Sequence, residues 1–187
     1  MEEEIEKCVS LLQAGKVILY PTDTIWGIGC DATNSEAIAR IFNIKQREES
    51  RSMLVLIDKT DRLPLYVNKL PLIAWDLLAT TTRPTTFIYP EGKNLPVGVI
   101  HPDGSVGIRV VQNSFCKKII SALGKPLIST SANLSGAPSP NTFREISTKI
   151  LDAVDYIVPE KYAVSTDFKP SRIIRYIDDY NFAVIRE

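Results

Sequence analysis

Apolar residues recur along this chain with two alternating periods, one typical of helices and the other of strands. Before Gly15 the period is helical. The apolar side chains there are Ile5, Cys8, Val9 and Leu12. A compact apolar run at 17–20 follows and is bounded by Pro21. The N-terminal segment therefore predicts a helix, then a strand, then a loop.

A second helix is predicted from a capping residue and one apolar face. Asn34 or Ser35 can cap it, because both side chains accept hydrogen bonds from free backbone N–H groups. Its apolar positions are Ala37, Ile38, Ile41 and Phe42. This helix would place Lys45 and Arg47 at or just beyond its C-terminal end.

Three further helices carry their own start or stop signals. Pro71 suits the first turn of one that continues through Trp75 and Leu78. Asn113 can cap another, which Gly124 ends. Thr142 lies three residues before Glu145, the spacing of a capping box, and this predicts a helix that ends near residue 150.

Short apolar runs between these helices predict strands. They lie at 53–57, 85–89, 106–110, 126–129, 154–158, 172–177 and 182–185. Residues 178–181 make a plausible turn between the last two. Because strands and helices interleave, we expect an α/β fold around one twisted, mixed open sheet flanked by helices. The length of 187 residues, without an internal repeat or linker, predicts a single domain over 1–187.

The composition narrows the functional classes. Apolar residues make up 44% and charged residues 24%, the balance of a soluble globular protein without membrane spans. Twenty-two basic residues match twenty-two acidic ones, so no overall field draws the chain onto nucleic acid. The acidic N-terminus does not resemble a secretory signal. We therefore expect a cytoplasmic protein.

Cysteine and histidine are scarce. Cys8, Cys30 and Cys116 are odd in number and widely spaced, so they predict buried thiols in place of a disulfide framework or a zinc site. His101 is the single histidine, which leaves little room for a Ser-His-Asp triad, and we expect it in a surface loop before Pro102.

Three loops are rich in small polar groups where a packed core would have none. They are residues 20–27, continuing to Asp31, then 45–47 with Arg51 nearby, and 129–136 followed by 138–140. Two cations in a Lys-x-Arg pattern suit a phosphate, and hydroxyl and amide groups suit phosphate oxygens or an amino acid. Taken alone, the first pattern also fits a solvated helix end and the second an ordinary turn.

The order of these motifs is more specific than any one of them. Pro-Thr-Asp-Thr with an aromatic residue and glycine (21–27) precedes Lys-x-Arg (45–47), Gly-Ile-Arg-Val (107–110) and Ser-x-Asn-x-Ser-Gly with Pro-Ser-Pro (131–140). The chain resembles the YrdC family from about residue 5 to about residue 177. Lys45, Arg47, Ser131 and Asn133 match the tetrad that marks members of the family competent for threonylcarbamoyl-adenylate synthesis. The sequence lacks the extra C-terminal domain of longer relatives, so it resembles the short, single-domain form.

The resemblance implies an activity and its partners. Family members join bicarbonate to the amino group of L-threonine and adenylate the carbamate with ATP, releasing pyrophosphate. The resemblance thus implies a nucleotidyltransferase with a concave substrate cleft and no organic cofactor, which uses Mg²⁺ bound mainly through ATP. It also implies a separate transferase complex that carries the product to tRNA, for the threonylcarbamoyladenosine modification.

Site residues carry over by position. For threonine they are Thr24, Trp26, Ser129 and Ser171. For ATP they are Lys45, Arg47, Arg51, Thr86, Arg109, Ser131, Asn133 and Ser139, and the tetrad is also the catalytic set. We expect Lys45 and Arg47 to be exposed in the cleft. Arg109 suits an inter-strand salt bridge equally well, Trp26 suits the core nearly as well, and Thr22 and Asp23 suit a role in shaping their loop.

Some segments depart from the family pattern. Residues 48–54 lack the usual prolines and the Asn-Pro-Leu stretch, Arg83 replaces a glycine, and Ser-Thr-Ser at 129–131 replaces Ala-Pro-Ser. Two alternatives therefore stay open. One is a paralogue with another carbamoyl or nucleotide reaction, and the other is a non-catalytic module that binds tRNA or double-stranded RNA.

Overall fold

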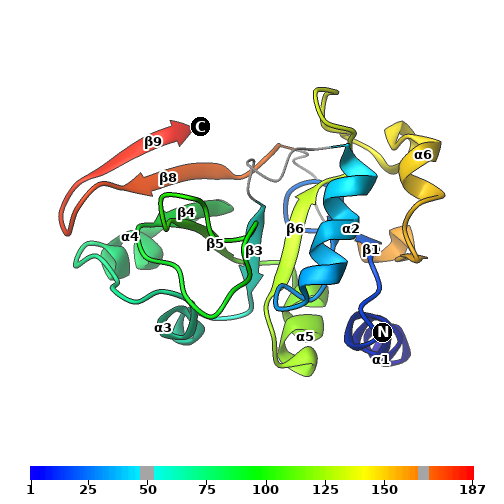
Figure 1. Ribbon diagram of the computed structural model, residues 1–187, viewed down its shortest axis with the longest axis horizontal. Coiled ribbons are helices and arrows are strands. Elements are labelled where there is room, and N and C mark those ends of the chain that lie inside the picture. Colours follow the sequence, from blue (N-terminus) through cyan, green and yellow to red (C-terminus); the bar gives the residue numbers. More distant parts are fainter. Residues whose placement is uncertain (47–52, 164–168) are drawn as a thin grey trace.

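A mixed open sheet organises the protein (Figure 1). The computed structural model describes residues 1–46, 53–163 and 169–187. From one edge to the other, the sheet strands are β7 (Tyr156–Ile157), β1 (Ile18–Tyr20), β2 (Gly27–Gly29), β6 (Leu127–Ser131), β3 (Leu54–Ile57), β5 (Val106–Val110), β4 (Thr85–Tyr89), β8 (Arg172–Tyr176) and β9 (Phe182–Arg186). The pairs β1/β7, β3/β5 and β4/β8 are parallel and the others antiparallel. The sheet is therefore mixed, as the interleaved sequence pattern predicted.

Helices cover both faces of this sheet. The α-helices are α1 (Glu2–Gln13), α2 (Ser35–Lys45), α3 (Leu63–Tyr66), α4 (Ala74–Thr80), α5 (Ser114–Leu123) and α6 (Thr148–Leu151), with 3₁₀ turns at Thr60–Arg62, Phe143–Glu145 and Glu160–Tyr162. Helices α1 and α5 pack together on one face, and α2 lies on the other, in front of β6 in Figure 1. None of the helices described here is long and apolar enough to cross a membrane.

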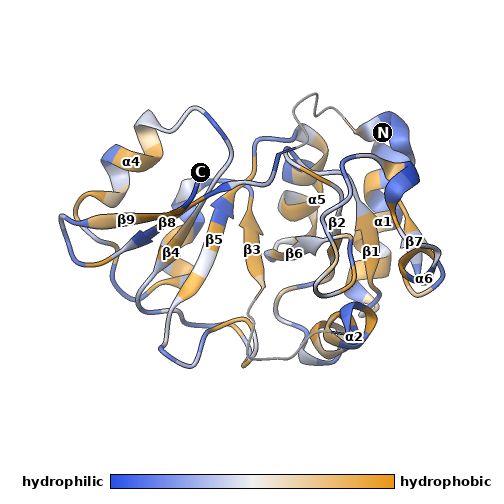
Figure 2. Cartoon of the chain, turned by 90° about the horizontal axis from the view of Figure 1, so that it is seen from above, coloured by the Kyte–Doolittle hydropathy of each residue, from blue (hydrophilic) through white to orange (hydrophobic). Residues whose placement is uncertain are grey.

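Strand alternation divides the apolar core into two clusters. In β1, Leu19 packs under α2 while Ile18 and Tyr20 face α1 and α5. Neighbouring residues of β6 divide in the same way, with Ile128 in the first cluster and Leu127 in the second. Because successive side chains of a strand point to opposite faces, a strand covered on both sides is apolar throughout. Figure 2 shows this hydrophobic character along β3.

Two of the predicted helix N-caps are confirmed. Asn34 Oδ1 accepts a hydrogen bond from Ala37 N at 3.0 Å, and Asn113 Oδ1 accepts one from Cys116 N at 3.0 Å. Gly124 ends α5 with a φ of 72°. Helix α2 ends after Lys45, because Gln46 adopts a left-handed φ of 51° that no helix can continue. The cap of α2 therefore fixes where the Lys45 side chain begins.

Two expectations about local structure were wrong. Residues 27–29 form β2 although the sequence predicted a loop, because the segment is three residues long and contains two glycines. The capping box does not start a helix: the Thr142 hydroxyl donates to Glu145 Oε1 at 3.2 Å within a 3₁₀ turn, and α6 begins only at Thr148. Strand β6 also extends to Ser131, so two of the predicted site serines lie on a strand.

The three cysteines are buried free thiols, as predicted. Burial raises the pKa of Cys8 to about 12 and raises those of Cys30 and Cys116 still further above the ordinary thiol value. Thiols in this state are protonated near neutral pH and react slowly.

Gly29 allows β2 to lie against β6, and its substitution tests the packing. A Cβ at Gly29 would lie 2.2 Å from the carbonyl oxygen of Ile128 and 2.7 Å from Cε1 of Tyr20. We expect Gly29→Ala to lower the free energy of unfolding by about 3 kcal/mol, the upper range for overpacking. Gly107→Ala is the control in urea denaturation, because its Cβ would meet Thr86 Cγ2 at an ordinary 3.5 Å. Equal stabilities of the two variants would contradict the packing described.

Candidate active site

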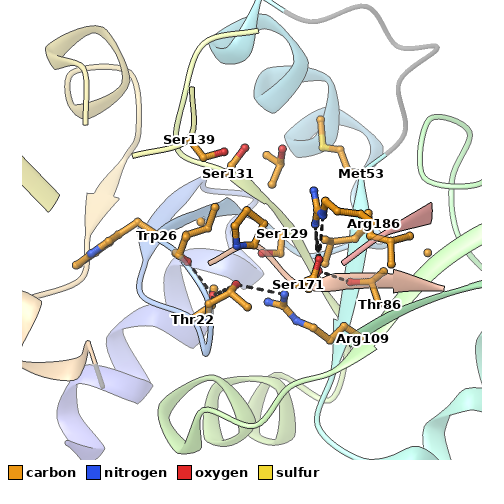
Figure 3. A pocket seen from close by; sticks show the side chains of 18 of the residues that line it. Thr22, Trp26, Met53, Thr86, Arg109, Ser129, Ser131, Ser139, Ser171 and Arg186 are labelled. Carbon is orange, nitrogen blue, oxygen red and sulfur yellow. Dashed lines mark hydrogen bonds between the residues drawn. The ribbon is translucent and has the colours of Figure 1, made fainter. Parts of the chain in front are cut away.

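A cavity of about 250 Å³ opens where the polar loops meet the middle of the sheet (Figure 3). Its walls come from the β1–β2 loop, from β3 to β6, from the loop after β6 and from the β8–β9 end of the chain. Eight of the predicted site residues line it: Thr24, Trp26, Thr86, Arg109, Ser129, Ser131, Ser139 and Ser171. Hydroxyl groups therefore dominate the polar part of the wall.

The absence of a side chain at Gly27 leaves room for these hydroxyl groups. Gly27 of β2 pairs with Ser131 of β6. A Cβ at this position would lie 3.0 Å from Ser129 Oγ and 3.4 Å from Thr22 Cγ2. On the other side of β6, Leu54 of β3 pairs with Ser129. Ser129 and Ser131 of β6 therefore lie between β2 and β3. Strand register thus places both serines at the cavity.

A buried ion pair forms one wall. Arg109 Nη2 of β5 lies 3.1 Å from Asp23 Oδ1, and the two side chains are 3% and 6% exposed. Arg109 Nη1 also donates to Thr24 Oγ1 at 3.3 Å, while Asp23 Oδ2 accepts from Gln112 N at 2.9 Å. Within the described ranges, Arg109 Nε is buried without a hydrogen-bond partner. Arg109 is thus both the salt bridge that the sequence allowed and a cavity residue with donor capacity left over.

The Thr22 hydroxyl shapes the loop beside this pair. It donates to the carbonyl of Ile25 at 2.7 Å and accepts from Thr24 N at 3.1 Å. Its oxygen also lies 2.9 Å from Thr24 Oγ1. The predicted loop-shaping role of Thr22 and Asp23 is therefore seen directly, and it holds the Thr24 hydroxyl against Arg109.

The same side of the cavity contains a residue that sequence reasoning missed. Arg186, near the C-terminal end, donates from Nε and Nη2 to the Ser171 carbonyl at 2.9 Å and 2.7 Å and lines the cavity. Ser171 Oγ lies 2.9 Å from Thr86 Oγ1. Partial burial and the neighbouring charge of Arg109 lower the pKa of Arg186. Figure 3 shows Arg186, Ser171, Thr86 and Arg109 on one side and Ser131 with Ser139 on another.

The tetrad residues do not share one environment. Ser131 lines the cavity, whereas Lys45 and Asn133 contact each other just behind it, with Lys45 Nζ 3.3 Å from Asn133 Oδ1. Lys45 is only 2% exposed, so the expectation of an exposed side chain in the cleft was wrong. The reason is that its ammonium group donates to backbone carbonyls of the loop after β6. Arg47 and Arg51 lie outside the described residues.

Two aromatic residues, Trp26 and His101, line the cavity, and the sequence predicted their surroundings only in part. Trp26 is 4% exposed, lines the cavity and packs on Phe143 with ring centroids 5.0 Å apart. It therefore belongs to both the core and the cavity wall. His101 also lines the cavity, although the sequence predicted an ordinary surface loop. Among the described residues, no group of three or more His, Cys, Asp or Glu side chains could hold a metal ion.

The cavity is lined by hydroxyl groups and by the guanidinium groups of Arg109 and Arg186, a set suited to anionic small molecules. The protein is thus of the α/β class, with a ligand cleft on an open sheet. Residues 10–187 match the family model Sua5_yciO_yrdC, described as "Telomere recombination". The chain therefore belongs to the Sua5/YciO/YrdC family, as the order of its motifs predicted.

Curated relatives extend over most of the chain. A threonylcarbamoyl-AMP synthase of Vibrio parahaemolyticus is 32% identical over 182 residues, covering 92% of this chain and 98% of the relative. One of Pseudoalteromonas translucida is 31% identical over 175 residues and covers 92% of both chains. A third, of Vibrio cholerae, is 34% identical over 162 residues, which cover 85% of this chain and 86% of the relative.

Solved structures share the fold. P. abyssi Sua5 complexed with L-threonine has a TM-score of 0.90 at 23% identity, and all of this chain matches 54% of that one. This chain thus spans about half the length of Sua5. E. coli YciO has a TM-score of 0.85 at 27% identity, and the match covers 100% of this chain and 90% of YciO. These likenesses confirm the mixed open sheet flanked by helices.

The Asp23–Arg109 pair predicts a large stability cost for its removal. Asp23→Ala leaves the Arg109 charge buried without its carboxylate, and we expect a loss of about 3–5 kcal/mol in the free energy of unfolding. Glu187→Ala is the control, because that carboxylate pairs with Arg83 and Arg172 while 65% exposed, and no measurable change is expected. Equal effects in urea denaturation would show that the buried pair has no special role.

Proposed function

We propose that the chain is an L-threonylcarbamoyladenylate synthase, a nucleotidyltransferase that makes threonylcarbamoyl-AMP and pyrophosphate from L-threonine, bicarbonate and ATP. The observation that carries the proposal is the convergence of the β1–β2 loop, the serines of β6 and two arginines on one cavity. Full-length relatives named threonylcarbamoyl-AMP synthase support the same substrates.

The cavity offers two kinds of binding group for two substrates. At one wall, the guanidinium group of Arg109 lies beside the Thr24 hydroxyl, to which its Nη1 donates, an arrangement suited to the carboxylate and hydroxyl of threonine. The Ser129 and Ser171 hydroxyls and the indole of Trp26 complete this part of the proposed threonine site. Threonine is therefore assigned to the side of the cavity nearest β5.

The second part of the cavity suits the nucleotide. Ser139 lies near Ser131 in Figure 3, and the Ser139 hydroxyl can donate to phosphate oxygens, whereas the Ser131 hydroxyl donates to Asn133 Oδ1. From the side of the cavity that holds Ser171, Arg186 supplies a positive charge and Thr86 a further hydroxyl. Arg47 and Arg51 stay predicted ATP contacts outside the described residues. Mg²⁺ would accompany ATP, held mainly by phosphate oxygens and water.

The reaction needs alignment more than a protein nucleophile. Bicarbonate and the threonine amino group form a C–N bond and lose water, which gives a carbamate. An oxygen of this carbamate attacks the α-phosphorus, and the bond to the pyrophosphate leaving group breaks. Arg186 and the hydroxyl groups would neutralise charge that develops on the phosphates. A separate transferase complex in the cytoplasm would then carry the threonylcarbamoyl group to tRNA.

Substrate dependence of turnover tests the proposal. The purified protein should release pyrophosphate from ATP only when threonine and bicarbonate are both present, measured with a coupled phosphate assay and omission controls. Threonine-independent release would favour a paralogue with another nucleotide reaction. Salt-dependent RNA binding without any ATP turnover would favour the non-catalytic module.

Two conservative variants test how the cavity is divided. Thr24→Val removes a hydroxyl near Arg109 and should raise the KM for threonine about tenfold, the cost of one hydrogen bond, with little change for ATP. Ser139→Ala removes a hydroxyl from the other side and should raise the KM for ATP instead. Steady-state kinetics with each substrate varied would contradict the division if both variants affected both substrates equally.

A further inference from the structure

The burial of Lys45 is unusual for a residue at a helix end. Lysine keeps its ammonium group in water in most proteins, yet Lys45 is 2% exposed and among the largest fully buried side chains here. It is the last residue of α2, immediately before the left-handed Gln46. A solvated charge at a helix end, the simpler interpretation of the sequence, is therefore excluded for Lys45.

Oxygen atoms of the loop after β6 surround the ammonium group. Lys45 Nζ donates to the carbonyl oxygen of Ser131, to that of Asn133 at 2.7 Å, and to Asn133 Oδ1 at 3.3 Å. An ammonium group has three N–H donors, and oxygen atoms of the described residues alone can occupy all three. The Lys45 carbonyl in turn accepts from Ser135 N at 2.8 Å. Helix α2 and the loop are thus joined through both the side chain and the backbone.

Asn133 connects this junction to the cavity. Its Oδ1 accepts from Lys45 and also from the hydroxyl of Ser131. Its Nδ2 donates to the carbonyls of Leu134 at 3.0 Å and Ala137 at 2.6 Å, which closes the loop. Ser131 lines the cavity, whereas neither Lys45 nor Asn133 is among the lining residues. The contacts therefore run from Lys45 through Asn133 to a hydroxyl group at the site.

We propose that Lys45 and Asn133 are positioning residues that hold Ser131 and the backbone of residues 131–135 at the cavity, and that the Lys45 ammonium group is not itself a ligand of the triphosphate. The inference rests on the proposed function for the identity of that ligand. A buried charge is costly unless oxygen atoms surround it, so the ammonium group fixes the loop strongly. Ser131 and the backbone of residues 131–135 are then held in place before the nucleotide arrives.

A double-mutant cycle separates this role from direct binding. The variants are Lys45→Met, Asn133→Ala and the double variant, assayed for turnover and for ATP affinity by calorimetry at several salt concentrations. Lys125→Met is the matched control, because Lys125 pairs with Asp31 at 2.8 Å outside the lining of the cavity, and its turnover should not change. Lys45→Gln repeats the salt series if Lys45→Met does not fold.

If Lys45 and Asn133 position Ser131 through one shared network, their effects on turnover should not add. Each single variant should lose about 10–100-fold in turnover, as for other residues that support a binding group, and the double variant should lose no more than the worse single. The salt dependence of ATP binding should stay that of the wild-type protein, because no phosphate contact is removed. Losses that multiply, or a flatter salt dependence, would overturn the proposal.

Stability measurements keep the test independent of the assigned reaction. Unfolding free energies of the four proteins should show coupling between Lys45 and Asn133 even if the wild-type protein forms no product, in which case only the proposed function fails. Lower stability with unchanged ATP binding and turnover would make the contact purely structural and would overturn the positioning role.

Discussion

A cation buried in a protein requires oxygen partners, and this requirement shapes the cavity from two directions. Arg109 meets the carboxylate of Asp23, and Lys45 meets carbonyl and amide oxygens after β6. The first contact fixes the β1–β2 loop against β5, and the second fixes the Ser131 loop against α2. Both contacts join segments far apart in the chain, so the loops lining the cavity are held by charge within an otherwise apolar fold.

Local signals in the sequence were sufficient for much of this fold. Asn34 and Asn113 cap their helices as predicted, since a cap depends on residues within one turn. Strand β2 was missed because Gly27 and Gly29 carry no strand preference of their own. Its place depends on β1 and β6, because the Tyr20 side chain and the Ile128 carbonyl leave no room for a Cβ at Gly29. Tertiary contacts, and not local preference, create that strand.

The candidate site was predictable in its membership but not in its geometry. The ordered motifs brought Thr24, Ser131 and Ser139 to one cavity, as expected for ligand loops. Arg186 gave no local signal, because it is the last residue of an ordinary apolar strand and reaches the cavity only through the pairing of β9 with β8. The burial of Lys45 depends on carbonyl oxygens about half the chain away, and every residue type carries such an oxygen. No side-chain pattern could have indicated it.

The three described residues of the family tetrad lie in two different environments in this chain. Ser131 faces the cavity, while Lys45 and Asn133 lie behind it in one hydrogen-bonded cluster. A motif that looks like one set of ligands in the sequence can therefore include both the groups that contact a substrate and those that orient them. The hydroxyl-rich wall then matches a reaction that depends on alignment and charge neutralisation.

The most direct measurement is a crystal structure of the protein with L-threonine and a non-hydrolysable ATP analogue. The account predicts both molecules in the one cavity, with the threonine carboxylate on Arg109 and phosphate oxygens within hydrogen-bond distance of Ser131 and Ser139. Density for the nucleotide elsewhere on the sheet, or an empty cavity at saturating ligand, would contradict it.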